Sequence, residues 1–180
     1  MSNQLGYVNP EEVLKNAVEL MALSARTAPK AAGKDFVVIK MLTGEEVVKL
    51  GEEMINYGRE HNKRNFDRDG ENVKNSVAVL LIGLENAQSA GLNCGACGFN
   101  NCEECQSHKG SEFDGPQCAL RILDMGIALG SAAKMAALLG IDNRIMYRIG
   151  VVAKKAGFIE ASLVMGIPCS VTGKNIYFDR

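Results

Sequence analysis

Five cysteines within 25 residues constrain this chain more than any other feature of its sequence. They are Cys94, Cys97, Cys102, Cys105 and Cys118, and a sixth cysteine, Cys169, stands alone near the end. The opening residues, MSNQLGYVNPEE, have neither the basic start nor the apolar stretch of a secretion signal. We therefore expect a cytoplasmic protein with reduced thiols, in which clustered cysteines predict a metal site rather than disulfides.

The spacing of these cysteines leaves three kinds of site open. Soft thiolates favour zinc or an iron–sulfur cluster. Only four residues separate the two C-x-x-C pairs, a shorter spacer than that of the common four-cysteine zinc site, so zinc is disfavoured. Cys97, Cys102 and Cys105 have the plant-type [2Fe–2S] spacing, whereas a second choice takes Cys94, Cys97, Cys102 and the more distant Cys118. Spacing alone does not decide between them.

The segment CGACGFNNC, followed by GPQC, resembles the four-cysteine [4Fe–4S] domain of corrinoid iron–sulfur proteins and of Rnf-type B subunits. The resemblance implies that Cys94, Cys97, Cys102 and Cys118 bind a [4Fe–4S] cluster, and it assigns no role to Cys105. Glycines at positions 95 and 98 suit such a loop, because they let backbone N–H groups turn toward the cluster. One departure is that no proline follows the last cysteine directly.

The sequence as a whole is similar to an uncharacterised family of ferredoxin-domain proteins from anaerobic bacteria and archaea. Besides the cysteine segment, the stretches LDMGIALGSAAKMAALLGIDNRIMYRIG and IPCSVTGKNIYFDR carry this likeness over nearly the full length. The family implies the cluster but supplies no reaction.

A second, weaker resemblance connects the chain outside the cysteine segment with flavin-dependent nitroreductases. SARTAPKAAGKDFVVI is similar to their helix–turn–strand entry, and the basic tail is similar to the end that meets the flavin phosphate. The likeness implies a homodimer that binds FMN, with Lys174 and Arg180 at the flavin phosphate. From the residues alone, Arg26, Lys30, Lys34, Lys174 and Arg180 could form a phosphate site, although solvated surface cations are the commoner case. The candidate cofactor-binding residues are Lys30, Lys174 and Arg180. The chain departs from the pattern at Lys30, the usual serine position, and at Gly33, the usual asparagine position, and it lacks the Q-P-W and R-x-S-x-R motifs.

Apolar patterning predicts helices that alternate with strands. We expect helices over residues 10–26, 43–61, 117–139 and 142–156. We expect buried strands over residues 36–39, 77–82 and 162–167. Thr43 begins a capping box, Asp142 and Asn143 are candidate caps, Pro168 should end the last strand, and polar residues 62–75 predict an exposed loop. The expected fold class is α+β, a three-layer α/β arrangement. Its nitroreductase-like core would comprise residues 1–91 and 119–180, with an iron–sulfur insert over 92–118.

Charge and hydropathy narrow the function classes. Twenty basic against 21 acidic residues give a net charge of −1, which argues against a nucleic-acid partner, and no apolar run has the length that a membrane helix needs. We therefore expect an iron–sulfur redox protein that passes single electrons to or from a redox partner protein. If it is an enzyme, we expect a flavin-type oxidoreductase that acts on an unknown substrate. The alternatives are a non-catalytic redox or oxygen sensor or binding module, and a zinc-stabilised protein. The sequence predicts no catalytic residue.

Overall fold

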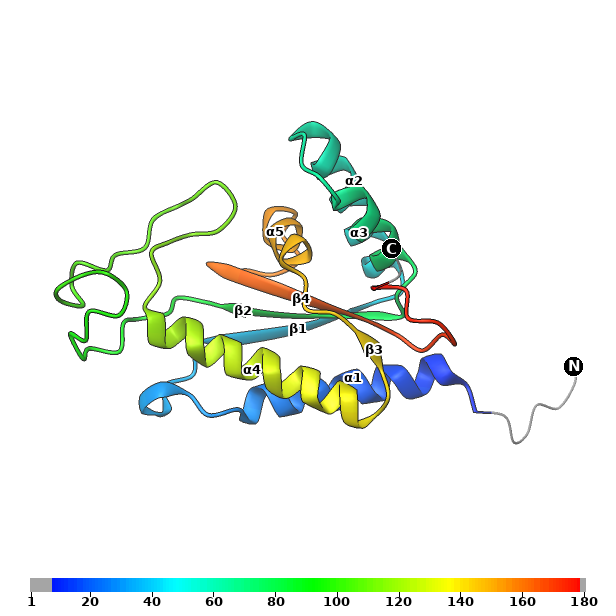
Figure 1. Ribbon diagram of the computed structural model, residues 1–180, viewed down its shortest axis with the longest axis horizontal. Helices are drawn as coiled ribbons and strands as arrows, with labels where there is room; N and C mark the ends of the chain where they lie inside the picture. Colours follow the sequence, from blue (N-terminus) through cyan, green and yellow to red (C-terminus); the bar gives the residue numbers. More distant parts are fainter. Residues whose placement is uncertain (1–7, 179–180) are drawn as a thin grey trace, which may run out of the picture.

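A four-stranded antiparallel sheet between two layers of helices forms the protein (Figure 1). The computed structural model describes residues 8–178. In chain order the elements are α1 (Pro10–Thr27), the 3-10 turn η1 (Ala31–Gly33), β1 (Val37–Thr43), α2 (Glu45–Glu60), α3 (Phe66–Lys74), β2 (Ala78–Leu84), α4 (Ala119–Leu138), β3 (Asp142–Asn143), α5 (Tyr147–Lys155) and β4 (Leu163–Ser170). The predicted α+β class with three layers is confirmed.

Strand β2 is the centre of the sheet, whose order is β1-β2-β4-β3. All seven of its residues are buried, as expected for an uninterrupted apolar run that is covered on both faces. Its last residue, Leu84, pairs with Val37 and Leu163, and its first residue, Ala78, pairs with Thr43 and Cys169. The two ends of the sheet can therefore be identified by Leu84 and Ala78.

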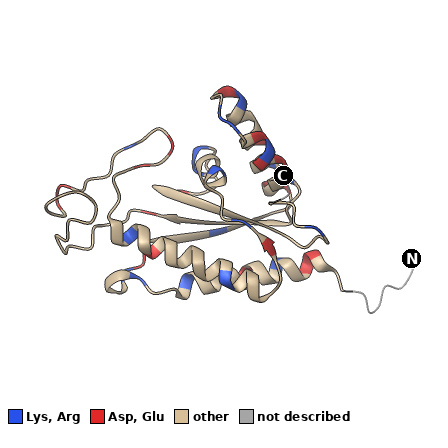
Figure 2. Cartoon of the chain, in the orientation of Figure 1, with Lys and Arg blue, Asp and Glu red and all other residues tan. Residues whose placement is uncertain are grey.

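Each face of the sheet has its own apolar core. Helices α1 and α4 cover one face, where Leu14, Met21, Met125 and Ala132 are among the buried side chains. Helices α2, α3 and α5 cover the other face, with Leu50, Met54, Phe66 and Ile149. Figure 2 shows several charged positions along α2. The buried residues of α2 are apolar residues, glycines and Tyr57, which is the distribution expected of an amphipathic helix on a core. None of the described helices combines the length and hydropathy needed to cross a membrane.

Residues 62–75 were predicted to be an exposed loop, and this prediction is wrong: they contain α3. The glycine at position 70, which suggested a loop, is a contact point between helices. A Cβ on Gly70 would lie 2.7 Å from the carbonyl oxygen of Gly51, and a Cβ on Gly51 would lie 2.6 Å from that of Gly70. Helix α3 therefore packs backbone to backbone on α2, with Phe66 and Val73 buried beneath it. That contact between distant residues overrides the polar composition.

Two predicted helix caps are also wrong. Thr43 is the last residue of β1, and Gly44, at φ 56°, makes the turn into α2 without a side-chain cap. Asp142 and Asn143 form β3, and the following helix, α5, begins only at Tyr147. In both cases residues that the local sequence predicts to begin a helix instead pair in a strand, β1 or β3.

Pro168 was predicted to end the last strand, but it lies inside β4. The backbone carbonyl of its neighbour Cys169 points toward β2, where it accepts the N–H of Val77 at 3.0 Å. Because backbone groups alternate along a strand, those of Pro168 point to the other side, toward β3. Strand β3 has already ended at Asn143, so no strand lies opposite Pro168 on that side. The missing N–H of proline therefore leaves no ladder hydrogen bond unmade.

Candidate functional site

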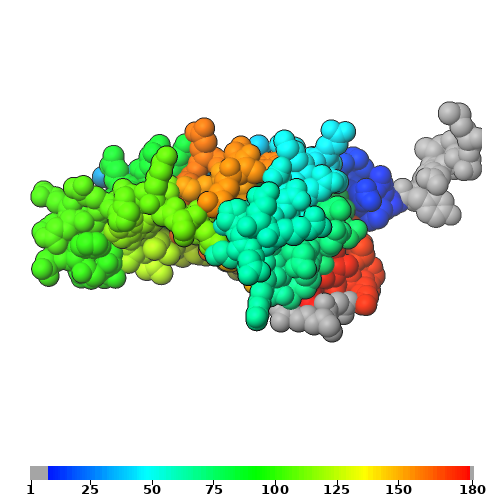
Figure 3. Space-filling view, turned by 90° about the horizontal axis from the view of Figure 1, so that it is seen from above, coloured from blue at the N-terminus to red at the C-terminus, as the bar shows by residue number. Residues whose placement is uncertain are grey.

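The cysteine segment leaves the sheet at the Leu84 end. Residues 85–118 connect β2 to α4 without a helix, and their only paired stretch is a two-bond bridge between His108 and Gly115. In Figure 1 this part of the chain, in green, extends beyond the end of the sheet, and in Figure 3 it forms one end of the molecule. A segment without regular secondary structure can wrap around a bound group.

Four of the cysteines line one small hollow. Its walls include Cys94, Cys97 and Cys102 from the loop and Cys118 from the start of α4, whereas Cys105 is not among them. Cys94 is exposed and Cys118 is buried, so the hollow extends from the surface of the segment to its base. No three His, Cys, Asp or Glu side chains in residues 8–178 converge closely enough to hold a single metal ion. The four cysteines instead line a shared space.

Backbone donors surround one of these sulfurs. The N–H of Asn93 donates to Sγ of Cys102 at 3.3 Å, and the Asn93 side chain accepts the N–H of Cys102 at 2.8 Å. The Asn93 N–H, followed by smaller contributions from Gly91, the Ser89 hydroxyl and Leu92, outweighs desolvation and lowers the pKa of Cys102. Left-handed backbone at Gly95 (φ 72°) and at a second loop glycine, at position 98 (φ 91°), gives the loop its tight turns. The segment therefore favours a thiolate at position 102.

Cys105 lies beside the hollow and has different chemistry. Burial, and next its hydrogen bond with Cys97, raise the pKa of Cys105 to about 11. Its sulfur is therefore a protonated thiol at neutral pH, which can donate to a neighbouring thiolate. This places Cys105 next to the candidate ligands without making it one of the residues that border the hollow.

The second half of the segment is anchored to the helices above the sheet. Glu112 accepts hydrogen bonds from the hydroxyls of Tyr57 in α2, at 3.3 Å, and of Tyr147 in α5, and forms an ion pair with Lys63 at 3.1 Å. Asp114 pairs with Lys154 of α5 at 2.6 Å. These contacts neutralise two of the acids in the segment and fix the chain that leads into Cys118.

Glu112→Gln is expected to destabilise the fold by about 1–3 kcal/mol at pH 7, because the carboxylate loses charge-assisted hydrogen bonds. Burial alone would raise the pKa of Glu112, but Tyr147 and Lys63 outweigh it and lower the pKa below 4.5. A carboxyl group whose pKa is lower in the folded than in the unfolded state stabilises the fold at pH values above its unfolded pKa. This contribution is lost as the pH falls through the pKa of the folded state. Urea unfolding at pH 7 and at pH 4 should therefore show a smaller gap between wild type and Glu112→Gln at the lower pH.

The control for this prediction is Glu103→Gln, which removes an exposed acid from the same segment. We expect its free energy of unfolding to stay within about 0.5 kcal/mol of wild type at both pH values. A gap for Glu112→Gln that widened on acidification would contradict the assigned sign.

Two of the three predicted flavin-phosphate residues, Lys30 and Lys174, lie far apart in a single chain. Lys30 follows α1 at the Leu84 end of the sheet, and its side chain is 5% exposed. Its Nζ donates to the carbonyls of Ala25 (3.1 Å) and Arg26 (2.6 Å) at the end of α1 and lies 3.7 Å from Asp35. Lys174 follows β4 at the opposite end of the sheet. Arg180 lies outside the described residues.

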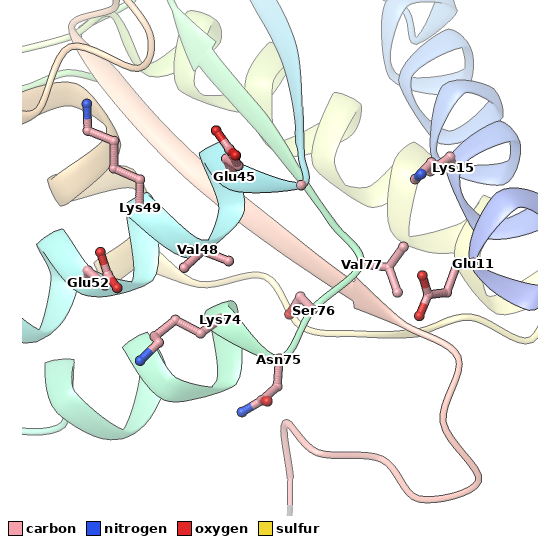
Figure 4. A pocket seen from close by; sticks show the side chains of 11 residues that line it. Glu11, Lys15, Glu45, Val48, Lys49, Glu52, Lys74, Asn75, Ser76 and Val77 are labelled. Carbon is pink, nitrogen blue, oxygen red and sulfur yellow. The ribbon is translucent and has the colours of Figure 1, made fainter.

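A wide, open hollow lies at the Ala78 end, remote from the cysteines (Figure 4). Its wall combines three lysines and three glutamates from α1, α2 and α3. These are Glu11, Lys15, Glu45, Lys49, Glu52 and Lys74. The balanced charges point to no class of ligand, and none of the residues predicted as functional lies in this wall.

Sequence analysis missed the residues that connect the cysteine segment to the core. Sequence patterns assigned no role to Glu112, Arg121 or Asp124. The structure buries Arg121 and Asp124 as an ion pair with 2.9 Å between Nη1 and Oδ2. The available signal was their place on the inner face of α4, where a charged residue is rarely buried without a partner.

Solved structures with this arrangement include nitroreductases and a nitroreductase-like protein. A nitroreductase with bound FMN from Desulfitobacterium hafniense has a TM-score of 0.57 at 13% identity and covers 88% of this chain and 78% of its own. A nitroreductase-like protein from Bacillus cereus has a TM-score of 0.58 at 11% identity, with coverages of 96% and 90%. The FMN-dependent nitroreductase of Mycobacterium smegmatis in complex with NADPH has a TM-score of 0.58 at 14% identity, with coverages of 93% and 80%. These similarities establish a nitroreductase fold.

Sequence comparison identifies a relative with much higher identity. A protein from Archaeoglobus fulgidus, described as uncharacterised, is 51% identical over 171 residues, which cover 94% of this chain and 92% of that protein. The model of the family described as uncharacterised proteins containing a ferredoxin domain (DUF2148) matches residues 114–180, a range that contains Cys118 but begins after the other predicted ligands. With identity of this level over nearly its whole length, the chain belongs to this family of ferredoxin-domain proteins.

Proposed function

We propose that the protein is an iron–sulfur redox protein whose cluster, a [4Fe–4S] group held by Cys94, Cys97, Cys102 and Cys118, passes single electrons. The observation that carries the proposal is the hollow lined by these four cysteines and by no other cysteine. When bound, such a cluster supplies one-electron transfer at a potential that depends on nearby hydrogen bonds and charge. The cysteine segment, residues 92–118, is the cluster-binding part of this proposal, and residues 1–91 and 119–180 form its core.

The donor set fits an iron–sulfur cluster better than a zinc ion. Four thiolates suit either group. A cluster occupies a volume and takes each thiolate at a separate corner, whereas a zinc ion draws its ligands to one point. The four cysteines line one space, and no three possible metal ligands within residues 8–178 converge on a point. The N–H of Asn93 favours a negatively charged sulfur at Cys102. All six cysteines are unpaired thiols, which agrees with a reducing compartment such as the cytoplasm of an anaerobe.

The proposal includes FMN as a second cofactor and a homodimer as its assembly. The flavin is supported by the nitroreductase fold, since solved proteins with this fold contain FMN. The homodimer is supported by the outer face of α4, where Ile122, Ile127 and Leu123 are 44–59% exposed and Gly126 and Gly130 have no neighbour within 4 Å of a Cβ. Because Lys30 and Lys174 lie at opposite ends of the sheet in one chain, they would have to come from different copies of the homodimer to meet one phosphate. A redox partner protein would meet the segment at its exposed edge.

A second candidate function is redox or oxygen sensing without turnover. One observation favours it: the Lys30 ammonium is already bound by carbonyls of α1 and by Asp35, so a flavin phosphate would have to displace these contacts. In that case the cluster itself would be the responsive group and the core would bind a ligand or a partner.

Anaerobic purification followed by analysis of a single sample tests the proposal. We expect about four iron and four acid-labile sulfide per chain, and a broad absorption near ~400 nm that dithionite bleaches. We expect FMN in the same sample, with its own band near ~450 nm, and a mass by light scattering of twice 19.4 kDa.

Each result bears on a different part of the proposal. Zinc without sulfide would replace the cluster by a structural zinc site. Cluster without flavin, in a chain that cannot take up FMN, would favour the sensor. A mass of one chain would remove the homodimer.

A further inference from the structure

Arg121 connects the candidate cluster site to two other segments. Its guanidinium is 1% exposed and lies in the first turn of α4, one turn after Cys118, whose carbonyl accepts the Arg121 N–H at 2.9 Å. The side-chain Nε donates to the carbonyl of Gln88, in the stretch that leads from β2 into the cysteine segment, at 2.9 Å. Its Nη1 donates to the carbonyls of Ala31 (3.0 Å) and Lys34 (3.3 Å) in the turn that follows α1. Nη2 has no hydrogen-bond partner in residues 8–178.

Asp124 completes this arrangement from the next turn of α4. One of its carboxylate oxygens pairs with Nη1 of Arg121 at 2.9 Å, and the other accepts the N–H of Ala31 at 2.7 Å. The two side chains together therefore bind both the N–H and the carbonyl of Ala31. We refer to Arg121 and Asp124 as the Ala31 clamp.

The turn that the clamp holds has strained backbone. Ala32 has φ 56° and ψ 21°, a left-handed conformation that residues with a Cβ rarely adopt, and Gly33 follows at φ 66°. Such backbone persists only where its surroundings over-determine it, and strained turns concentrate at ligand clamps and switch regions. Here the surroundings are the clamp and the ring of Phe36, 4.8 Å from the Arg121 guanidinium carbon. The same turn carries Lys30.

We propose that the Ala31 clamp couples the cluster to the turn of residues 30–34, so that cluster binding at Cys118 orders this turn and cluster loss releases it. The inference rests on the proposed cluster. A cluster bound to Cys118 and to the loop after Gln88 would fix both segments that contact Arg121. Arg121 and Asp124 would then hold the Ala31 peptide in place. Without the cluster the first turn of α4 loses its anchor, and the strained turn relaxes. Arg121 and Asp124 are thus positioning residues for the turn that carries the candidate flavin residue Lys30.

Hydrogen–deuterium exchange of the holoprotein and of the same protein stripped of iron by a chelator tests this coupling. In wild type we expect the amides of residues 31–34 to exchange at least about tenfold faster after stripping, with β2 unchanged. In Arg121→Met we expect fast exchange in both states, with iron and sulfide retained. The matched control is Arg148→Met on the other face of the sheet. It removes the cation that pairs with buried Asp69, with 2.8 Å between Arg148 Nη1 and Asp69 Oδ2. It should keep the wild-type difference.

Iron and sulfide measured on every sample separate the two ways of failing. Four iron and four sulfide with equal exchange in both wild-type states would overturn the coupling and leave the proposed function standing. Absence of iron and sulfide from wild type would overturn the proposed function, and the coupling with it. Should Arg121→Met not fold, Asp124→Asn replaces it, since this variant keeps an oxygen toward Ala31 but loses the ion pair. A full wild-type difference in Asp124→Asn would contradict the role of the pair.

Discussion

Cys118→Ala is expected to abolish the iron–sulfur cluster, whereas Cys105→Ala keeps it. Cys118 borders the hollow at the start of α4, and Cys105 lies outside its wall. A cluster that loses one of its four thiolates loses both iron and inorganic sulfide, so the content should fall from about four of each toward zero. The measurement is iron and sulfide per chain after anaerobic purification, with the ~400 nm absorption as the optical check.

The two cysteines form a matched pair, because each variant removes one sulfur from the same segment. Far-UV circular dichroism shows whether both variants keep the helices of the fold. Loss of the cluster in Cys105→Ala and its retention in Cys118→Ala would instead select the plant-type [2Fe–2S] ligand set, which includes Cys97, Cys102 and Cys105.

Gly150→Ala is expected to destabilise the protein by about 3 kcal/mol or more. A Cβ at this position in α5 would overlap the carbonyl oxygen of Val164 in β4, so the backbone of one element would have to move. A backbone atom cannot escape into another rotamer, as a flexible side chain could. The gain in helix propensity, about 1 kcal/mol, does not offset this overlap. Urea unfolding measures the free-energy change.

Gly126→Ala is the control with the opposite expected sign. Gly126 lies on the exposed face of α4, and a Cβ there would meet nothing within 4 Å of its own chain. The substitution should therefore stabilise the single chain by about 1 kcal/mol through helix propensity alone. A Gly150→Ala variant as stable as wild type would show that α5 can move away from β4 without cost.

Much of the core follows from local sequence, because burial leaves a local pattern. The run from Val77 to Ile82 predicts a strand that is covered on both faces, and β2 is buried along its whole length. The helices over 10–26 and 117–139 have the apolar spacing of a covered helix, and α1 and α4 lie within a residue or two of those bounds. In each case the apolar pattern of residues adjacent in the chain is enough to predict the element.

The cysteine motif and the structure agree in a different way. The motif, through its resemblance, selects four of five neighbouring cysteines, and the hollow in the structure is bordered by those four. The role of the four as ligands stays a prediction until iron and sulfide are measured. The pattern could not indicate that Glu112 and Asp114, two of the acids in the same segment, are paired with Lys63 and Lys154.

The sequence by itself determined most of the element types of the core, because hydropathy patterning along the chain encodes them. The set of candidate ligands came from the resemblance of the cysteine motif to a known cluster-binding domain. Only the tertiary structure decided the rest. It turned the glycine at position 70 from a loop signal into a helix contact, and it placed Lys30 and Lys174 at opposite ends of the sheet. It also put Asp124 against the peptide of Ala31, 93 positions away. Contacts between residues so far apart depend on how the layers pack, and no local pattern of hydropathy or turn residues records them.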